Sequence, residues 1–383
     1  MSIDMAGLYI HVPFCLAKCP YCDFYSTTRL DRIDDYVQAL LAELGMYRQA
    51  IATLDSIYLG GGTPSLLAPD QVARIIDAVT VDYTLAGNVE VTLEVNPGTV
   101  TRRTLAAYRR AGINRLNIGL QSLENDALRL LGRIHTAEEG LRTYGWAREV
   151  GFENLGLDLI YARPGQTLPD WQAELAAAVE LQPEHFSCYT LTLEKGTPMA
   201  DSVRNGTTQP LNERTAVRLF ETTIDHLETN GFRQYEISNF ARHAADDPID
   251  RRSRHNRKYW MAASYLGVGA AAHSFRDGTR WWNHRSLDRY MADVCTDHLP
   301  VSGRERLTRD QQIMEWVYLG LRQTEGIKLA DFSTRFGEEF MSMFGAQVPP
   351  LIDAGLLEHV SGRIRLTRRG MPLLEAVVDR ILG

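Results

Sequence analysis

The chain has 383 residues, enough for one large domain and a smaller one. With 44% hydrophobic and 23% charged residues, the composition is that of a globular protein with a sizeable core, which excludes extended disorder. The net charge of −7 argues against a nucleic-acid partner held mainly through phosphate contacts.

The chain shows no signal for membrane insertion or secretion. No apolar run approaches the roughly 20 residues of a membrane-spanning helix. The first residues lack a basic segment followed by a long apolar one, so we expect no signal peptide and a cytoplasmic protein. Of five cysteines, three fall within eight residues, which does not fit a disulfide framework.

Up to about residue 191, short apolar strands alternate with amphipathic helices. The predicted strands are Leu8–Phe14, Ser56–Leu59, Val89–Val95, Arg115–Gly119, Leu155–Ile160 and His185–Leu191. The predicted helices include Asp34–Gln49, Pro69–Val79, Thr101–Arg110, Ala137–Val150 and Pro169–Leu181. This sixfold alternation predicts an α/β fold, a parallel sheet curled into a full or partial barrel with helices outside.

The regular alternation of strands and helices ends after residue 200. A long helix over Asn212–Asn230 precedes a region from Phe232 to about Trp282 that reads as irregular and is rich in aromatic residues and histidine. From about Thr308, three helices, a hairpin turning at Ser361-Gly362 and a final helix predict a smaller winged-helix-like α+β domain for packing or as a lid. We therefore expect a barrel over 1–200, a barrel extension over 201–300 and the winged-helix-like domain over 301–383.

The strongest motif is the cysteine segment that follows the first predicted strand. Cys15, Cys19 and Cys22 have the spacing Cys-x3-Cys-x2-Cys on one loop. Thiolates are the ligands of iron–sulfur clusters, and complete ligation normally takes four of them. Since Asp23 and Phe24 stand where a fourth cysteine might, the motif predicts a [4Fe–4S] cluster with one iron open to a small molecule. The alternative is a zinc site with His11 as fourth ligand.

Polar or glycine residues occur at or near the ends of the other strands. The second strand runs into Gly60-Gly61-Gly62-Thr63, where the missing Cβ atoms let a ligand approach the backbone, although a tight turn fits equally well. In parallel α/β barrels the chemistry gathers at the C-terminal strand ends. The further candidates on this rim are Glu94, Gln121, Arg133, Asp158 and Tyr189.

These motifs together resemble the radical S-adenosylmethionine (SAM) family of oxygen-independent coproporphyrinogen III oxidases and their relatives. The resemblance spans almost the whole chain and implies a [4Fe–4S] cluster and SAM as cofactors. It implies that Cys15, Cys19 and Cys22 bind the cluster. The positions that match SAM contacts in the family are Tyr9, Tyr21, Gly61, Gly62, Thr63, Glu94, Gln121, Arg133 and Asp158.

Two departures set the chain apart from the oxidases of this family. The oxidases continue the motif as Cys-x-Cys, whereas Asp23-Phe24 follows Cys22 here, and they carry an N-terminal extension for which no room is expected before the first strand. Both departures match the sister group of heme chaperones. That resemblance implies heme as a further ligand.

The sister group also carries a His-Asn-x-x-Tyr-Trp motif, present here from His255 to Trp260. The resemblance makes His255 a heme-ligand candidate, with Tyr259 and Trp260 covering the macrocycle and Arg254 or Lys258 meeting its propionates. Residue type alone favours the structural interpretation, in which Tyr259 and Trp260 are anchors and His255 caps a loop, and the resemblance reverses this preference.

Two further residues stand near the expected cofactor rim. His273, in a segment that matches the family close to SAM, is a second candidate for heme or SAM contact. Arg163 stands where the family usually has an uncharged residue, and it either meets a carboxylate or points to water.

The leading hypothesis is a heme chaperone that binds the cluster, SAM and heme and hands heme to an acceptor apoprotein. The alternatives are oxidative decarboxylation of coproporphyrinogen III, another radical SAM enzyme, or a zinc-stabilised binding module. The implied partners are the heme acceptor and an electron donor for the cluster, with a homodimer and a peripheral membrane contact as further expectations.

Overall fold

The computed structural model describes residues 5–48, 51, 53–243 and 249–383. Its larger part is a curved sheet built around six parallel strands, each hydrogen-bonded to the next in sequence order. The predicted α/β partial barrel is therefore confirmed. The six strands are β1 (Met5–Val12), β2 (Thr53–Gly61), β3 (Leu85–Val95), β4 (Arg115–Gln121), β5 (Leu155–Tyr161) and β6 (His185–Thr190).

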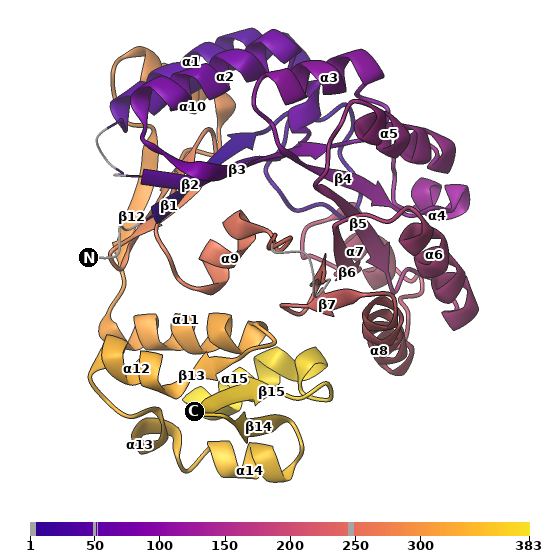
Figure 1. Ribbon diagram of the computed structural model, residues 1–383, viewed down its shortest axis with the longest axis vertical. Helices are drawn as coiled ribbons and strands as arrows, with labels where there is room; N and C mark the ends of the chain where they lie inside the picture. Colours follow the sequence, from indigo (N-terminus) through magenta and orange to yellow (C-terminus); the bar gives the residue numbers. More distant parts are fainter. Residues whose placement is uncertain (1–4, 49–50, 52, 244–248) are drawn as a thin grey trace.

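Helices cover the convex side of this sheet (Figure 1). They are α1 (Ile33–Met46), α2 (Pro69–Asp82), α3 (Arg102–Arg110), α4 (Asn125–Leu130), α5 (Ala137–Glu149) and α6 (Leu168–Glu180). Five of them were predicted, and the end predicted for the first, at Gln49, lies outside the described residues. Threonine side chains at positions 101, 136 and 167 cap the backbone N–H groups that open α3, α5 and α6.

The sheet extends beyond both ends of the six-stranded core. The region that was expected to be irregular contains two short strands beside β6 and three of the four beside β1, so that expectation was wrong. The tight turn at Asp277-Gly278, where both residues have positive φ, joins two strands into a hairpin. The added strands are β7 (Phe232–Gln234), β8 (Asn239–Arg242), β9 (Tyr265–Val268), β10 (His273–Arg276), β11 (Thr279–Asn283) and β12 (Val301–Arg306).

Side chains alternate between the two faces of the sheet, and this alternation places the site. Leu8, Ile10 and Val12 of β1 are fully buried in the main core, while Tyr9 and His11 point to the concave face. The concave face therefore carries polar and aromatic side chains. The helices that follow the barrel are α7 (Pro198–Arg204), α8 (Glu213–Thr229), α9 (Arg254–Trp260) and α10 (Leu287–Cys295).

The C-terminal part has its own hydrophobic core, with Phe332 and Phe340 at its centre. It confirms the predicted smaller winged-helix-like domain, including a hairpin that turns at Ser361-Gly362. No helix of the described chain is long and apolar enough to cross a membrane. The elements are α11 (Arg309–Arg322), β13 (Ile327–Lys328), α12 (Leu329–Phe336), α13 (Phe340–Phe344), α14 (Val348–Asp353), β14 (Leu357–Val360), β15 (Arg363–Leu366) and α15 (Leu374–Leu382).

Candidate functional site

The three clustered cysteines lie on a loop that leaves the C-terminal end of β1. Backbone hydrogen bonds close this loop, because the N–H of Cys15 donates to the carbonyl of Thr27 at 2.9 Å and the N–H of Thr27 donates to Pro13 at 2.7 Å. Within the loop, the N–H of Cys22 donates to the carbonyl of Cys19 at 3.2 Å. The three thiols are partly exposed and form no disulfide.

Polar groups from other elements face these sulfur atoms. The hydroxyl of Thr63 lies 3.6 Å from the sulfur of Cys15, and the guanidinium of Arg133 lies 3.7 Å from the sulfur of Cys19. Burial raises the pKa of the Cys22 thiol, and the neighbouring Cys19 and Cys15 add to the rise. The loop thus carries the three sulfurs on one short segment, with hydrogen-bond donors beside those of Cys15 and Cys19.

The zinc alternative is not supported. Both ring nitrogens of His11 are already used, by the hydroxyl of Tyr9 and the carbonyl of Tyr25, each at 3.0 Å. Among the residues that the structure describes, no three His, Cys, Asp or Glu side chains converge so as to hold one metal ion. A cluster has no such need, since each thiolate binds a separate iron.

The glycine segment at the end of β2 is hydrogen-bonded to the chain at the start of the cysteine loop. The N–H of Thr63 donates to the carbonyl of Phe14 at 2.7 Å. A Cβ at Gly61, where φ is +111°, would stand 2.6 Å from the ring of His11, and one at Gly62 would stand 2.7 Å from the carbonyl oxygen of Phe14. Only glycine allows this close approach.

Glu94 is the carboxylate at the centre of the rim. Its two oxygens accept hydrogen bonds from the hydroxyl of Tyr58 at 2.8 Å and from the N–H of Gly61 at 3.2 Å. Burial, together with the nearby Asp158, raises the pKa of Glu94 to about 7. Tyr58 was missed in the sequence, although its place two residues before Gly60 on β2 puts both on the concave face.

Arg133 joins three parts of the rim. Besides the sulfur of Cys19, its guanidinium donates to the side-chain oxygen of Asn96 at 2.6 Å and to the carbonyl of Gly119 at 3.1 Å. Its Nε is buried and has no partner among the described residues. Since a buried donor without an acceptor is costly, this atom fits a site that receives an additional group.

The remaining predicted SAM contacts lie on the same inner surface. Asp158 sits within β5 and accepts from the amide of Asn117 at 2.7 Å, so its expected structural partner is present. Burial raises the pKa of Tyr21, which neighbours Arg133 and Cys19. Gln121 ends β4 with a positive φ of 63°. The structure thus brings the predicted rim residues together.

The raised pKa of Glu94 predicts a measurable pH dependence of stability. A carboxyl whose pKa is higher in the folded state stabilises the fold below its unfolded pKa of 4.5, and this contribution is lost as pH rises through about 7. We expect wild type to lose stability relative to Glu94→Gln over that interval. Urea unfolding of the cofactor-free chain between pH 5 and 8 measures the difference, and the exposed Glu153→Gln should show none.

Helix α9, which carries the His-Asn-x-x-Tyr-Trp motif, lies against the concave face (Figure 1). His255 is fully buried, and its two ring nitrogens contact the hydroxyl of Ser56 at 3.1 Å and that of Tyr259 at 2.9 Å. Its ring stacks on Tyr58 with the centroids 5.2 Å apart. Burial lowers the pKa of His255 to about 3, so the ring is neutral. Heme ligation by His255 stays a prediction, and it would require one of these hydrogen bonds to break.

The other motif residues also make internal contacts. Lys258 is buried and pairs with Asp55 at 2.7 Å, so it is not free to meet a propionate in this arrangement. Arg254 donates to the carbonyl of Asn88 at 2.9 Å through one guanidinium nitrogen. The ring of Trp260 lies 4.4 Å below the guanidinium of Arg322 on α11. In this arrangement the motif joins the barrel to the C-terminal domain.

Replacing His255 with alanine should destabilise the protein by about 2–4 kcal/mol, since two buried hydrogen bonds and the ring packing are lost. Urea unfolding at pH 7 provides the measurement. The exposed His298→Ala should change the unfolding free energy little. A loss in His255→Ala no larger than in His298→Ala would show that α9 is not held through this ring.

His273 begins β10 and differs from His255 in being exposed. Its ring stacks on Trp282 of β11, with a centroid separation of 5.9 Å and an angle of 26° between the planes. No hydrogen bond within the described chain engages either ring nitrogen. Partial burial, with Arg280 and Arg285 nearby, lowers the pKa of His273.

Arg163 meets a carboxylate and does not point to water. It forms a buried ion pair with Glu174 of α6 at 2.7 Å. Glu174 also accepts from the hydroxyl of Ser122 and from the N–H of Leu123 at 2.8 Å. The pair therefore holds the segment that follows Gln121 at the end of β4.

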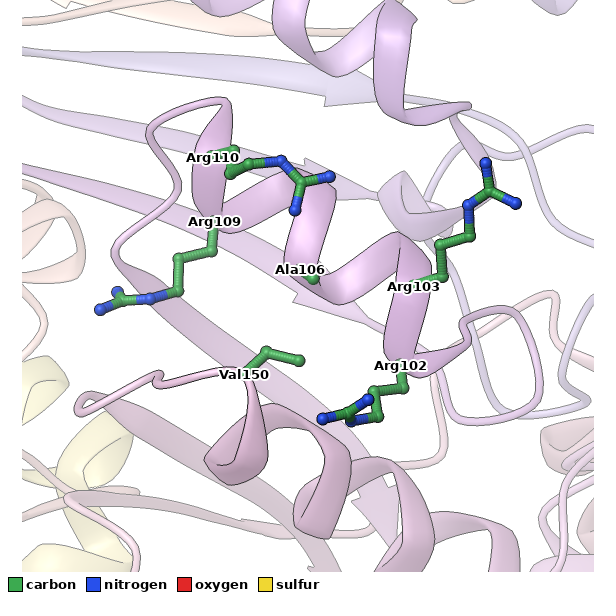
Figure 2. Close-up of a pocket in the computed structure, with 6 residues that line it drawn as sticks. All are labelled: Arg102, Arg103, Ala106, Arg109, Arg110 and Val150. Carbon is green, nitrogen blue, oxygen red and sulfur yellow. The ribbon is translucent and has the colours of Figure 1, made fainter.

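A separate hollow lies outside this site. Figure 2 shows it at α3 on the helical layer, with a volume of about 770 Å³. One of its arginines, Arg102, pairs with Glu149 at 2.8 Å. None of the predicted site residues is among its lining residues, which are Arg102, Arg103, Ala106, Arg109, Arg110 and Val150.

Comparison with known proteins agrees with the fold and with the cysteine loop. Residues 9–177 match the Radical SAM superfamily, and residues 307–373 match the HemN C-terminal domain. The fold is that of the coproporphyrinogen III oxidase HemN from Escherichia coli, with a TM-score of 0.84 at 23% identity over 99% of this chain and 90% of HemN. These observations define a radical SAM protein.

Proteins of similar sequence show to which family of radical SAM proteins the chain belongs. The heme chaperone HemW of Bacillus subtilis is 32% identical, and the match covers 99% of this chain and 100% of that protein. HemW of Mycobacterium tuberculosis is 34% identical, over 98% of this chain and 95% of its own length. The chain therefore belongs to the HemW family of radical SAM proteins.

Proposed function

We propose that this protein is a heme chaperone that binds a [4Fe–4S] cluster, SAM and heme and transfers heme to an acceptor apoprotein. The observation that carries the proposal is the loop of three free thiols at the end of β1, facing a polar rim on the concave face. The relatives named heme chaperones support the heme part of the proposal.

The cysteine loop suits a cluster with one open iron. Cys15, Cys19 and Cys22 supply three thiolates, and no fourth cysteine follows on the loop. Thr63 and Arg133 donate toward two of the sulfurs, and hydrogen bonds of this kind tune the reduction potential of a cluster. When bound, the cluster supplies the electron that cleaves SAM, and an electron-donor partner replenishes it.

The rim offers complementary groups for SAM. The Glu94 carboxylate suits an ammonium or a ribose hydroxyl, and the guanidinium of Arg133, whose Nε has no partner in the described chain, suits a carboxylate. Gly61 and Gly62 let the end of β2 pack against His11 and Phe14, which keeps this edge of the rim close to the cysteine loop. The chain's own contribution is to bind and orient SAM beside the open iron.

The test is heme transfer from the anaerobically reconstituted protein. The chain should bind heme with a shifted Soret band and should pass it to a heme-free acceptor, whose own holo spectrum then appears. The second candidate function, coproporphyrinogen III oxidation, predicts formation of protoporphyrinogen IX in the same preparation with SAM and a reductant. Turnover of coproporphyrinogen, or a failure to bind heme, would overturn the chaperone proposal.

The expected partners and location are also part of the proposal. The proposal includes an acceptor apoprotein, a homodimer and a peripheral membrane contact, which rest on the resemblance, and a cytoplasmic location, which rests on the sequence pattern. Size-exclusion chromatography of the cluster-loaded protein with and without heme, followed by vesicle flotation, separates the dimer from the membrane contact.

A further inference from the structure

The concave face continues past β1 onto β9, β10 and β11, and this extension holds an unassigned set of side chains. Register and alternation put Tyr265 and Gly267 of β9, Phe275 of β10 and Trp282 of β11 on one face. Ring contacts agree, since Tyr265 lies 6.4 Å from Phe275 and Trp282 stacks on His273. The result is an aromatic wall beside the cofactor rim, on a face that also carries Arg280 in ion pairs with Glu305 and Glu315.

His273 is the histidine of this wall that can accept a ligand bond. The rings of His11 and His255 use both nitrogens in internal hydrogen bonds, whereas no hydrogen bond in the described part of the chain engages the ring of His273. Its pKa is lowered by partial burial and by Arg280 and Arg285. A neutral imidazole with a free nitrogen is the form that binds metals.

Gly267 and Gly303 permit this arrangement because they have no side chain. A Cβ at Gly267 would overlap the backbone carbonyl of His273, and a Cβ at Gly303 of β12 would overlap the indole of Trp282. Both positions therefore need glycine for β10 to approach β9 and for Trp282 to lie flat against the sheet.

A cation stands beside the wall. Arg285 is exposed, its guanidinium lies 5.9 Å from the ring centre of Tyr25, and no carboxylate of the described chain pairs with it. The hydroxyl of Tyr25 accepts a hydrogen bond from the N–H of Leu287 at 3.0 Å, and its ring stacks on His11 with the centroids 6.5 Å apart. The neighbouring Phe24 is 64% exposed. Aromatic surface, a free imidazole and an unpaired guanidinium suit a flat macrocycle with a central metal and carboxylate arms.

We infer that heme binds on the inner face of β9–β11, with a ring nitrogen of His273 as axial ligand, Trp282 packed beside it and Arg285 at a propionate. The inference rests on the proposed heme-chaperone function and assigns its cargo site. It gives α9 and its His255 an anchoring role in place of ligation. Heme would then lie next to the cysteine loop, on the side of β1 opposite to β2.

The test is heme titration of the cluster-loaded protein, followed by absorption and magnetic circular dichroism spectra. His273→Ala should bind heme about 10–100-fold more weakly and lose the histidine-ligated spectrum. Added imidazole should restore that spectrum in the variant, which a merely structural defect would not allow. Arg285→Ala should weaken binding several-fold with the spectrum unchanged, while Arg103→Ala on the remote α3 hollow should have no effect.

The outcomes separate the two proposals. If wild type binds no heme, the chaperone function and this site both fall. If wild type binds heme and His273→Ala binds it with the same affinity and spectrum, the site is overturned while the function stands. Loss of the histidine-ligated spectrum in His255→Ala, with folding intact by urea unfolding, would assign the ligand to α9 instead.

Discussion

We expect Cys15→Ala to abolish binding of the proposed cluster. The loop supplies three thiolates and no fourth cysteine, so removing one leaves two ligands for a centre that needs at least three protein bonds to keep a single open iron. Anaerobic reconstitution should give a brown wild-type protein with iron and sulfide in equal amounts. The variant should stay nearly colourless, with bound iron at background.

The matched control is Cys295→Ala, which removes an exposed thiol far from the loop in sequence. It should reconstitute as wild type does. SAM binding by equilibrium dialysis should be lost together with the cluster in Cys15→Ala, because in the proposed site SAM binds at the open iron. Full iron content in Cys15→Ala would mean that the three cysteines do not share one cluster, and the cofactor assignment would fall.

Arg163→Ala destabilises the fold by about 3–5 kcal/mol, since it leaves the Glu174 carboxylate buried without its cation. The segment at Ser122 and Leu123 loses its fixed partner at the same time. Urea unfolding of the cofactor-free chain measures the loss. SAM affinity should also fall, because Gln121 directly precedes that segment.

Two further variants isolate the ion pair. Arg163→Lys keeps the charge but lacks the forked donors, so it should recover only part of the stability. The double variant Arg163→Met with Glu174→Leu removes both charges and should cost less than Arg163→Ala alone, because no unpaired charge remains buried. A double variant as unstable as the single one would show that packing, and not the buried charge, sets the cost.

The barrel could be predicted from the sequence because its strands are apolar runs separated by amphipathic helices. Arg115 begins β4 and Leu155 begins β5 as expected. Strand β3 begins four residues before the predicted Val89, since Gly87 and Asn88 disfavour a strand in isolation. Helix α4 was missed because six residues are too few to show a helical period.

The extension of the sheet could not be predicted in the same way. The glycine- and alanine-rich run at Gly267–Ala272 lacks the alternation of a strand, and β9 is held in place by parallel pairing with β1, more than 250 residues earlier. Long-range pairing of this kind overrides local propensity. The aromatic wall and Arg285 were overlooked for the same reason.

The site residues likewise fall into two groups: those that motifs identify and those whose role depends on partners distant in the sequence. The cysteine loop, Glu94 and Arg133 could be named from motifs, and the structure brings them together. The burial of His255 could not be foreseen, because its partners Ser56 and Tyr58 lie about 200 positions away in the chain. Whether Arg163 meets a carboxylate or points to water could likewise not be decided from the sequence, because its partner Glu174 lies on another element, α6.

Helix α9 also limits the route by which ligands would reach and leave the concave face. Glu90 receives the first backbone N–H groups of the helix, and Lys258 holds the carbonyl of Met5, so the helix blocks the barrel at the amino ends of its strands. A ligand on the concave face would then exchange at the opposite ends of the strands, on the side of the cysteine loop. If SAM and heme bind as proposed, a macrocycle on the adjoining wall would narrow this route, which favours loading SAM before the cargo.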